Sequence, residues 1–191
     1  MSELADAIRS CRLCPLGDIR INAVPADVGA NYSGLAIMGE APGAQEDETG
    51  VPFVGRAGRI LESLLNDAGM SRDEVMVINR VRCRPPRNNL ASYPEAAEQC
   101  DLWTKAELET YAPRVIVLMG ATAIRAIFGS TVTVGEVRGT IRKTGESGQY
   151  GARTWVPTYH PASLMPHRSP QNRGLVVADL MLARELLRLE A

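Results

Sequence analysis

Four short apolar runs alternate along the chain with longer stretches in which apolar residues recur every three or four positions. The short runs occupy residues 35–39, 75–79, 115–119 and 154–159, and their length is typical of buried strands. The longer stretches cover about residues 57–68, 92–110, 121–128 and 170–189, with a shorter helical stretch at residues 3–10. Strands that alternate with helices predict an α/β protein with a parallel sheet and helices on both of its faces.

Cap and turn signals refine this pattern. The segment Ser92-Tyr-Pro-Glu95 has the form of a capping box, so we expect a helix to begin there. Residues 135–153 are rich in glycine and polar side chains and predict a hairpin or a flexible loop. The sequence has no internal repeat, and its 191 residues are enough to bury one core. We therefore expect a single domain over residues 1–191.

Chemically useful residues follow each of the four predicted strands. The first strand leads into Gly39-Glu40-Ala41-Pro42-Gly43, the second ends at Asn79, Gly120 follows the third, and His160 follows the last. Ligands of open parallel sheets bind beyond the carboxyl ends of the strands. The convergence of these groups predicts an active site at that edge. The chain lacks both GxGxxG and the P-loop pattern, so nicotinamide and nucleoside triphosphates are poorly supported.

The composition is that of a globular protein, with 45% hydrophobic and 23% charged residues. No apolar run approaches the roughly 20 residues that cross a bilayer. The first residues lack the apolar core of a signal peptide. We therefore expect a cytoplasmic protein that does not associate with membranes.

The net charge of −1 hides an uneven distribution of basic residues. A segment without any acid contains Arg80, Arg82, Arg84 and Arg87. A local basic surface suits a phosphate backbone held at one face. Charge alone is equally compatible with scattered, solvated arginines.

The cysteines are Cys11, Cys14, Cys83 and Cys100. Cytosolic proteins seldom keep structural disulfides, so these thiols indicate metal or redox chemistry. The Cys11–Cys14 pair is a CxxC motif, and with two further thiols it could bind zinc or an iron–sulfur cluster. The alternative is a redox pair with two ordinary core cysteines. Because the motif lies between a short helical stretch and a Pro-Leu-Gly loop, a metal site fits better than a thioredoxin-type pair.

Several blocks of sequence resemble the iron–sulfur (family 4) uracil-DNA glycosylases. The blocks are Gly39-Glu-Ala-Pro-Gly-Ala-Gln-Glu-Asp47, Gly50-Val-Pro-Phe-Val-Gly55, Asn79-Arg-Val-Arg-Cys-Arg-Pro-Pro86 and His160-Pro161. The resemblance extends over almost the whole chain. It implies a three-layer α/β/α sandwich around a four-stranded parallel sheet. It also implies a 4Fe–4S cluster bound by Cys11, Cys14, Cys83 and Cys100, whereas the cysteine spacing alone would have favoured zinc.

The resemblance further implies a role for each polar residue at the strand ends. His160 would donate a hydrogen bond to the uracil anion, and Asn79 would pair with uracil O4 and N3–H. Phe53 would stack on the flipped base. By themselves, a structural histidine and a turn-forming asparagine are realistic alternatives for the first two.

The loop of residues 39–43 is expected to bring backbone N–H groups close to the base. Ala41 stands where the best-known uracil glycosylases have an Asp, so the attacking water must be positioned by another group. We expect Glu46 to position that water or to exclude the thymine methyl group, and Glu40 to organise the pocket.

After His160 the chain departs from the usual family pattern. Leu164 or Met165 is expected to act as the wedge that fills the space left by the flipped base, and Arg168 to contact phosphate. The expected partners are uracil-containing DNA, single- or double-stranded, and free uracil as product. We expect a monomer.

The resemblance predicts a monofunctional glycosylase, because the two lysines, Lys105 and Lys143, are not obvious lyase nucleophiles. One alternative is a non-catalytic iron–sulfur protein that binds nucleic acid on the same fold. The combination of Asn79, Phe53 and His160 argues against it. A second alternative is a CxxC redox protein.

Overall fold

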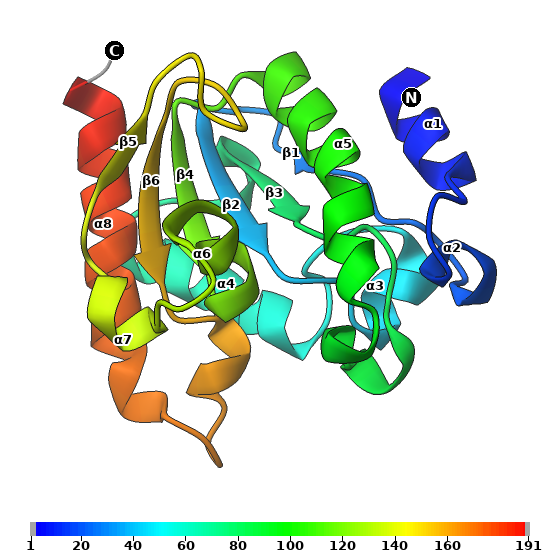
Figure 1. The fold of residues 1–191 in the computed structure, drawn as a ribbon. Coiled ribbons are helices and arrows are strands. Elements are labelled where there is room, and N and C mark those ends of the chain that lie inside the picture. The colour runs from blue at the N-terminus through cyan, green and yellow to red at the C-terminus, as the bar shows by residue number, and fades with distance from the viewer. Residues whose placement is uncertain (1–2, 190–191) are drawn as a thin grey trace.

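A computed structural model describes residues 3–189 and contains one sheet with helices packed against it (Figure 1). The sheet has six strands in the order β1-β3-β2-β4-β6-β5. Their bounds are β1 Asp27–Val28, β2 Leu35–Gly39, β3 Val75–Asn79, β4 Val115–Met119, β5 Arg142–Thr144 and β6 Arg153–Thr158. The four inner strands are parallel, and both edge strands are antiparallel to their neighbours.

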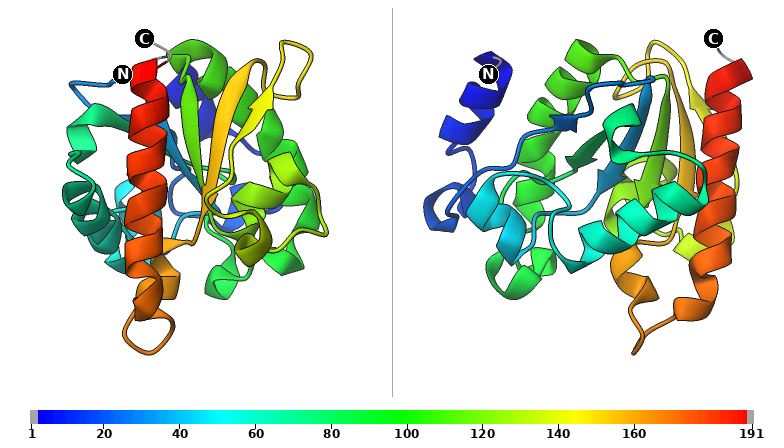
Figure 2. Two further views of the ribbon diagram at one scale, coloured as in Figure 1. Left: turned by 90° about the vertical axis from the view of Figure 1, so that its left-hand side faces the viewer. Right: turned by 180° about the vertical axis from the view of Figure 1, so that it is seen from behind.

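Helices cover both faces of the sheet (Figures 1 and 2). The helices are α1 Glu3–Ser10, α2 Leu16–Ile19, α3 Ala44–Thr49, α4 Arg56–Asp67, α5 Pro94–Tyr111, α6 Ala121–Phe128, α7 Val134–Val137 and α8 Arg173–Leu189. Alternate strand residues such as Ile37 and Val117 pack with apolar residues of α4 and α8. Their neighbours, such as Met38 and Leu118, pack with α5 and α6. The inner strands are thus buried on both sides, which explains the apolar sequence of β2, β3 and β4 and the apolar centre of β6.

A third apolar cluster lies between the N-terminal helices and α5. Ile8 of α1 and Leu16 of α2 pack there with Ala96, Cys83 and Cys100. This cluster attaches the N-terminal segment to α5 and to the segment that follows β3. Across residues 3–189, none of the helices has the length and apolar character needed to span a membrane.

The structure corrects two expectations about the elements. The sheet has six strands instead of four, because the edge strands β1 and β5 are too short or too polar to give an apolar signal. Ser92 does not cap α5. It lies in the 3₁₀ turn Leu90–Ser92, where its hydroxyl accepts a hydrogen bond from Asn89, and Tyr93 precedes the first residue of the helix. The hairpin expected within residues 135–153 is present as the β5–β6 pair, preceded by α7.

A buried ion pair supports the end of β3. The side chains of Arg82 and Glu107 are each 1% exposed, and the Arg82 Nε lies 3.0 Å from Glu107 Oε2. Arg82 also donates to the main-chain carbonyl of Asn79. Glu107 accepts a further hydrogen bond of 2.6 Å from the backbone N–H of Ala26. Arg82 therefore serves a structural role instead of belonging to a solvated basic surface.

Candidate active site

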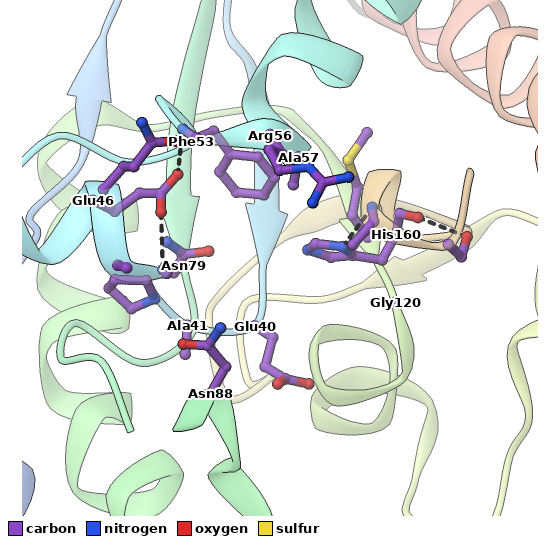
Figure 3. Close-up of a pocket in the computed structure, with 18 of the residues that line it drawn as sticks. Glu40, Ala41, Glu46, Phe53, Arg56, Ala57, Asn79, Asn88, Gly120 and His160 are labelled. Carbon is purple, nitrogen blue, oxygen red and sulfur yellow. Dashed lines mark hydrogen bonds between the residues drawn. The ribbon is translucent and has the colours of Figure 1, made fainter. Parts of the chain in front are cut away.

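A pocket of about 620 Å³ lies at the carboxyl ends of the four parallel strands (Figure 3). It receives residues that follow β2, β3, β4 and β6, together with the segment that precedes α4. The residues expected at the site that line it are Glu40, Ala41, Pro42, Gly43, Glu46, Phe53, Asn79, Gly120, His160, Met165 and Arg168. Gly39 is buried directly below, against Phe53 and Asn79. The structure therefore brings together nearly all of the residues selected from the sequence.

Gly39 permits the close approach of two pocket side chains. A Cβ atom at this position would lie 2.5 Å from Cζ of Phe53 and 2.6 Å from Oδ1 of Asn79. Any residue with a side chain would thus displace the aromatic ring or the amide. Phe53 itself has a φ angle of 53°, a left-handed conformation that aromatic residues rarely adopt.

Asn79 presents an unused hydrogen-bonding atom to the pocket. Its side chain is 2% exposed, and its Oδ1 atom has no hydrogen-bond partner among residues 3–189. Buried polar atoms are normally paired, and leaving one unpaired costs about 1–3 kcal/mol. An orphaned acceptor that lines a pocket indicates a ligand with a matching donor.

His160 lies across the pocket from Asn79, with its ring centroid 5.8 Å from that of Phe53 (Figure 3). Its Nδ1 accepts a hydrogen bond of 3.1 Å from the backbone N–H of Ala162. The neutral ring therefore carries its proton on Nε2. Burial, reinforced by the nearby positive charge of Arg168, lowers the pKa of His160 to about 4. At neutral pH the residue is an uncharged hydrogen-bond donor.

Glu46 connects the two loops that form one wall of the pocket. It is 7% exposed, and its carboxylate accepts from the backbone N–H of Gly43 at 3.0 Å and from that of Gly55 at 2.7 Å. The first bond caps the start of α3, because the side chain of Glu46 reaches back to the backbone N–H of the glycine that precedes the helix. Glu46 thus fixes the 39–43 loop relative to the loop that carries Phe53.

Glu40 is half-buried and accepts a hydrogen bond from the hydroxyl of Thr122, in the first turn of α6. Gly120, which begins that turn, lies against His160, because a Cβ atom there would be 3.0 Å from Cβ of His160. Sequence reasoning did not select Thr122. A hydroxyl residue two positions after a strand-end glycine was the available signal for it.

The two candidates for the wedge have different surroundings. Leu164 is 7% exposed and packs in the core with residues of α4 and α8. Met165 is partly exposed and lines the pocket. Arg168 is exposed at the pocket rim. This arrangement favours Met165 over Leu164 as a group that can enter DNA.

The four cysteines gather at the N-terminal side of the domain, in the cluster shared by α1, α2 and α5. Cys14, Cys83 and Cys100 pack in this cluster, and Cys11 contacts it through Trp103, whose indole N–H lies 3.1 Å from the Cys11 Sγ. Arg20 donates to the Sγ of Cys83 at 3.1 Å. Burial raises the pKa of the Cys83 thiol to about 11, an effect that Arg20 opposes. Within residues 3–189, no three His, Cys, Asp or Glu side chains are arranged to hold a single metal ion.

The sequence matches a family of known proteins over the part of the chain that forms the pocket. A family model described as Uracil DNA glycosylase superfamily matches residues 26–181, a range that contains the whole sheet and the whole pocket lining. This chain belongs to the uracil DNA glycosylase superfamily. The resemblance recognised in the sequence is therefore confirmed.

The curated relatives are similar over nearly the full chain. A type-4 uracil-DNA glycosylase of Thermotoga maritima is 36% identical over 191 residues, which are 100% of this chain and 96% of that protein. The type-4 uracil-DNA glycosylase of Archaeoglobus fulgidus is 38% identical, covering 97% of this chain and 94% of that protein. That of Saccharolobus solfataricus is 35% identical, covering 96% and 85%. These superfamily members match the N-terminal segment as well as the domain that the family model describes.

Proposed function

We propose that this protein is a uracil-DNA glycosylase. It flips deoxyuridine out of DNA and hydrolyses the N-glycosidic bond, releasing uracil and leaving an abasic site for base-excision repair. The relatives' names support this activity. The observation that carries the assignment is the buried Oδ1 of Asn79, which has no hydrogen-bond partner in the described part of the chain and lines the same pocket as an aromatic ring and a neutral histidine.

Base recognition follows from the geometry of the amide. Uracil offers a donor at N3 and an acceptor at O4, side by side in one plane. The Oδ1 of Asn79 accepts from N3–H while its Nδ2 donates to O4. Phe53 stacks on the face of the base, a contact worth about 1–3 kcal/mol. The base thus supplies the partner that Asn79 lacks.

Bond cleavage leaves negative charge on the departing uracil. His160 donates its Nε2–H to O2 of the base, where that charge develops. Glu40 and Ala41 line the same pocket and are the residues of the 39–43 loop whose backbone N–H groups could add to this stabilisation, since Pro42 has no N–H and that of Gly43 binds Glu46. The neutral ring can make this bond because Nδ1 accepts from Ala162, which leaves the proton on Nε2. The lowered pKa of His160 means that a neutral imidazole, not an imidazolium, is the donor at neutral pH.

The two carboxylates have different duties. Glu46 already accepts hydrogen bonds from two backbone N–H groups, so its first role is to hold the pocket loops. Because it also lines the pocket, its carboxylate can accept a further hydrogen bond from the attacking water. Glu40, restrained by Thr122, organises the floor of the pocket. Ala41 has a methyl group where a third carboxylate could otherwise stand.

The segment after His160 contacts the DNA. Met165 enters the space left by the flipped nucleotide and is supported by Leu164, which is packed in the core, and Arg168 contacts phosphate.

A 4Fe–4S cluster is the group that best fits the four thiols. Thiolates of one zinc ion lie within about 4 Å of each other, since Zn–S bonds are about 2.3 Å long, whereas a cubane holds its ligands farther apart. Cys14, Cys83 and Cys100 pack in one apolar cluster and Cys11 lies beside it, next to Trp103, so these four thiols are the residues that would hold the 4Fe–4S group. When bound, the cluster would cross-link the N-terminal helices to the β3–α5 segment and stabilise the fold.

We also infer that the helices and sheet form a three-layer sandwich around the four central strands, that the protein is a monomer and that it is located in the cytoplasm.

Cleavage of a uracil-containing oligonucleotide tests the proposal. The protein is incubated with duplexes that carry U, T or C at one position, and alkali then breaks the strand at abasic sites. We expect cleavage only at U. Binding to the U duplex without strand breakage would refute the activity and support the non-catalytic alternative. A protein inert to DNA whose CxxC thiols exchange with disulfides would support the redox alternative.

A further inference from the structure

Arg72 reaches the loop that carries Phe53 from outside the pocket. It begins the 3₁₀ turn Arg72–Glu74 before β3 and stands apart from the described residues of the pocket lining. Its Nη1 donates to the carbonyl of Phe53 at 3.1 Å, and its Nη2 donates to the carbonyl of Pro52 at 2.6 Å. One guanidinium therefore binds two successive carbonyl groups of the loop.

The backbone of this loop needs external support. Phe53 has a φ of 53°, and such a conformation persists in a bulky residue only where its surroundings impose it. Gly58 allows the approach on one side, since a Cβ atom there would lie 1.7 Å from the Phe53 carbonyl oxygen. Arg72 holds the same carbonyl oxygen by a hydrogen bond. Gly58 leaves room for the left-handed conformation of Phe53, and the hydrogen bond from Arg72 stabilises it.

Asp27 orients the guanidinium. Its Oδ2 lies 2.8 Å from Nη2 and 3.2 Å from Nε of Arg72. Asp27 is itself placed by the edge strand β1, where it pairs with Val77 of β3. The two-residue strand that the sequence did not predict thus anchors the side chain that holds the Phe53 loop.

We propose that Arg72 is a positioning residue for base recognition, a role that rests on the proposed function. By binding the carbonyls of Pro52 and Phe53, it fixes the Phe53 ring over Gly39 and beside His160, where the flipped base stacks. Loss of these bonds lets the loop leave its left-handed conformation. The ring then moves relative to Asn79, although the hydrogen bonds of Arg72 within residues 3–189 go to Asp27, Pro52 and Phe53 and to neither Asn79 nor His160.

The test compares R72M with R173M. Arg173 forms a similar pair, with Nε 3.0 Å from Asp67, but it lies on the surface between α8 and α4. We expect R72M to slow single-turnover uracil cleavage by about 10-fold or more, since misplacement by about 1 Å can cost 10²-fold. R173M should cleave at the wild-type rate. Binding should separate the causes: R72M weakens binding to a duplex with non-cleavable 2′-fluoro-deoxyuridine, yet binds an abasic-analogue duplex normally, because Phe53 contacts only the base.

A double-mutant cycle with F53A shows whether Arg72 acts through Phe53. We expect F53A and the F53A/R72M double variant to cleave at the same rate, because the ring that Arg72 positions is gone. Effects that multiply, or an equal loss of binding to the abasic duplex, would overturn the proposal. Should R72M fail to fold, R72K retains a cation beside Asp27 but cannot span both carbonyls. Wild-type activity in a folded R72K would equally overturn it.

The outcomes also separate the two levels of the argument. A wild-type protein that cleaves no uracil refutes the proposed function, and with it the role of Arg72. A wild-type protein that cleaves uracil, with R72M indistinguishable from R173M, refutes the role of Arg72 alone.

Discussion

Replacing Gly39 by alanine tests how closely the pocket is packed. The new Cβ atom would lie 2.5 Å from Cζ of Phe53 and 2.6 Å from Oδ1 of Asn79. Ordinary contacts between such atoms are about 3.5 Å, so the ring or the amide must move by about 1 Å. Gly39 ends β2 and is held in register with Asn79 of β3, so the backbone cannot yield easily.

The displacement should lower both activity and stability, and the protein is stable enough to remain folded while the rate falls. Over-packing of a core costs about 1–3 kcal/mol, and for a domain of this size each kcal/mol lowers Tm by about 2–4 °C. Misplacing a group that orients substrate by 1 Å can cost about 10²-fold in rate. We therefore expect kcat/KM for uracil cleavage to fall about 100-fold in Gly39→Ala, with a protein that remains folded at 25 °C.

Single-turnover cleavage of a U-containing duplex, with thermal unfolding in parallel, measures both effects. Gly174→Ala is the matched control: a Cβ atom there meets nothing within 4 Å among the described residues, and the position lies in α8. This variant should cleave at the wild-type rate and unfold at the same or a slightly higher temperature. A folded Gly39→Ala that retains full activity would refute the placement of Phe53 and Asn79 around the base.

The remaining predictions concern four positions. His160→Ala should slow cleavage about 100-fold or more but leave binding to an abasic-site duplex unchanged. Because the pKa of His160 is lowered to about 4 in the folded protein, the rate of the wild-type protein should show no inflection near pH 6.5. The free energy of unfolding should fall as the pH drops from about 6.5 towards 4, because in that range the histidine is protonated only in the unfolded chain. Asn79→Asp should weaken cleavage of U and permit detectable cleavage of C in matched duplexes, since a carboxylate repels O4 and accepts from the cytosine amino group; unaltered U cleavage would contradict this pairing. The anaerobically purified protein should contain about four iron atoms per chain, and Cys83→Ala should be colourless and fold poorly; a colourless wild type with one zinc would refute the cluster. Glu107→Leu leaves the buried Arg82 without its partner and should lower the free energy of unfolding by about 3–5 kcal/mol, measured with urea.

The central fold was predictable because burial alone dictates it. The four inner strands are covered on both faces, so β2, β3 and β4 are almost entirely apolar, and β6 has apolar residues at its centre. The edge strands gave no such signal. Residues 142–144 are polar and largely exposed, and Asp27–Val28 is too short to show any periodicity. These two strands form because the neighbouring strands β6 and β3 have unpaired backbone groups along one edge. The false cap at Ser92 has a similar cause, since local pattern cannot reveal that a 3₁₀ turn takes that position first.

The pocket residues likewise fall into those that the sequence could predict and those that it could not. Gly39, Asn79 and His160 follow predicted strands, so their convergence could be inferred from topology. Thr122 and Arg72 could not be selected in that way, because their importance depends on contacts made across space with Glu40 and with the Phe53 loop. The environment of Leu164 also depends on how the segment after β6 packs against α4 and α8, which no single-sequence pattern encodes.

The order of strands has a consequence for how the protein is made. The pocket needs β2, β3, β4 and β6 at once, and β6 is added last, beside β4, near the end of the chain. Parallel pairings between distant segments form slowly, because long loops must close before any contact forms. A chain emerging from synthesis up to residue 150 has β4 as an open sheet edge and does not yet contain His160. The pocket is therefore complete only when the last parallel strand, β6, lies beside β4.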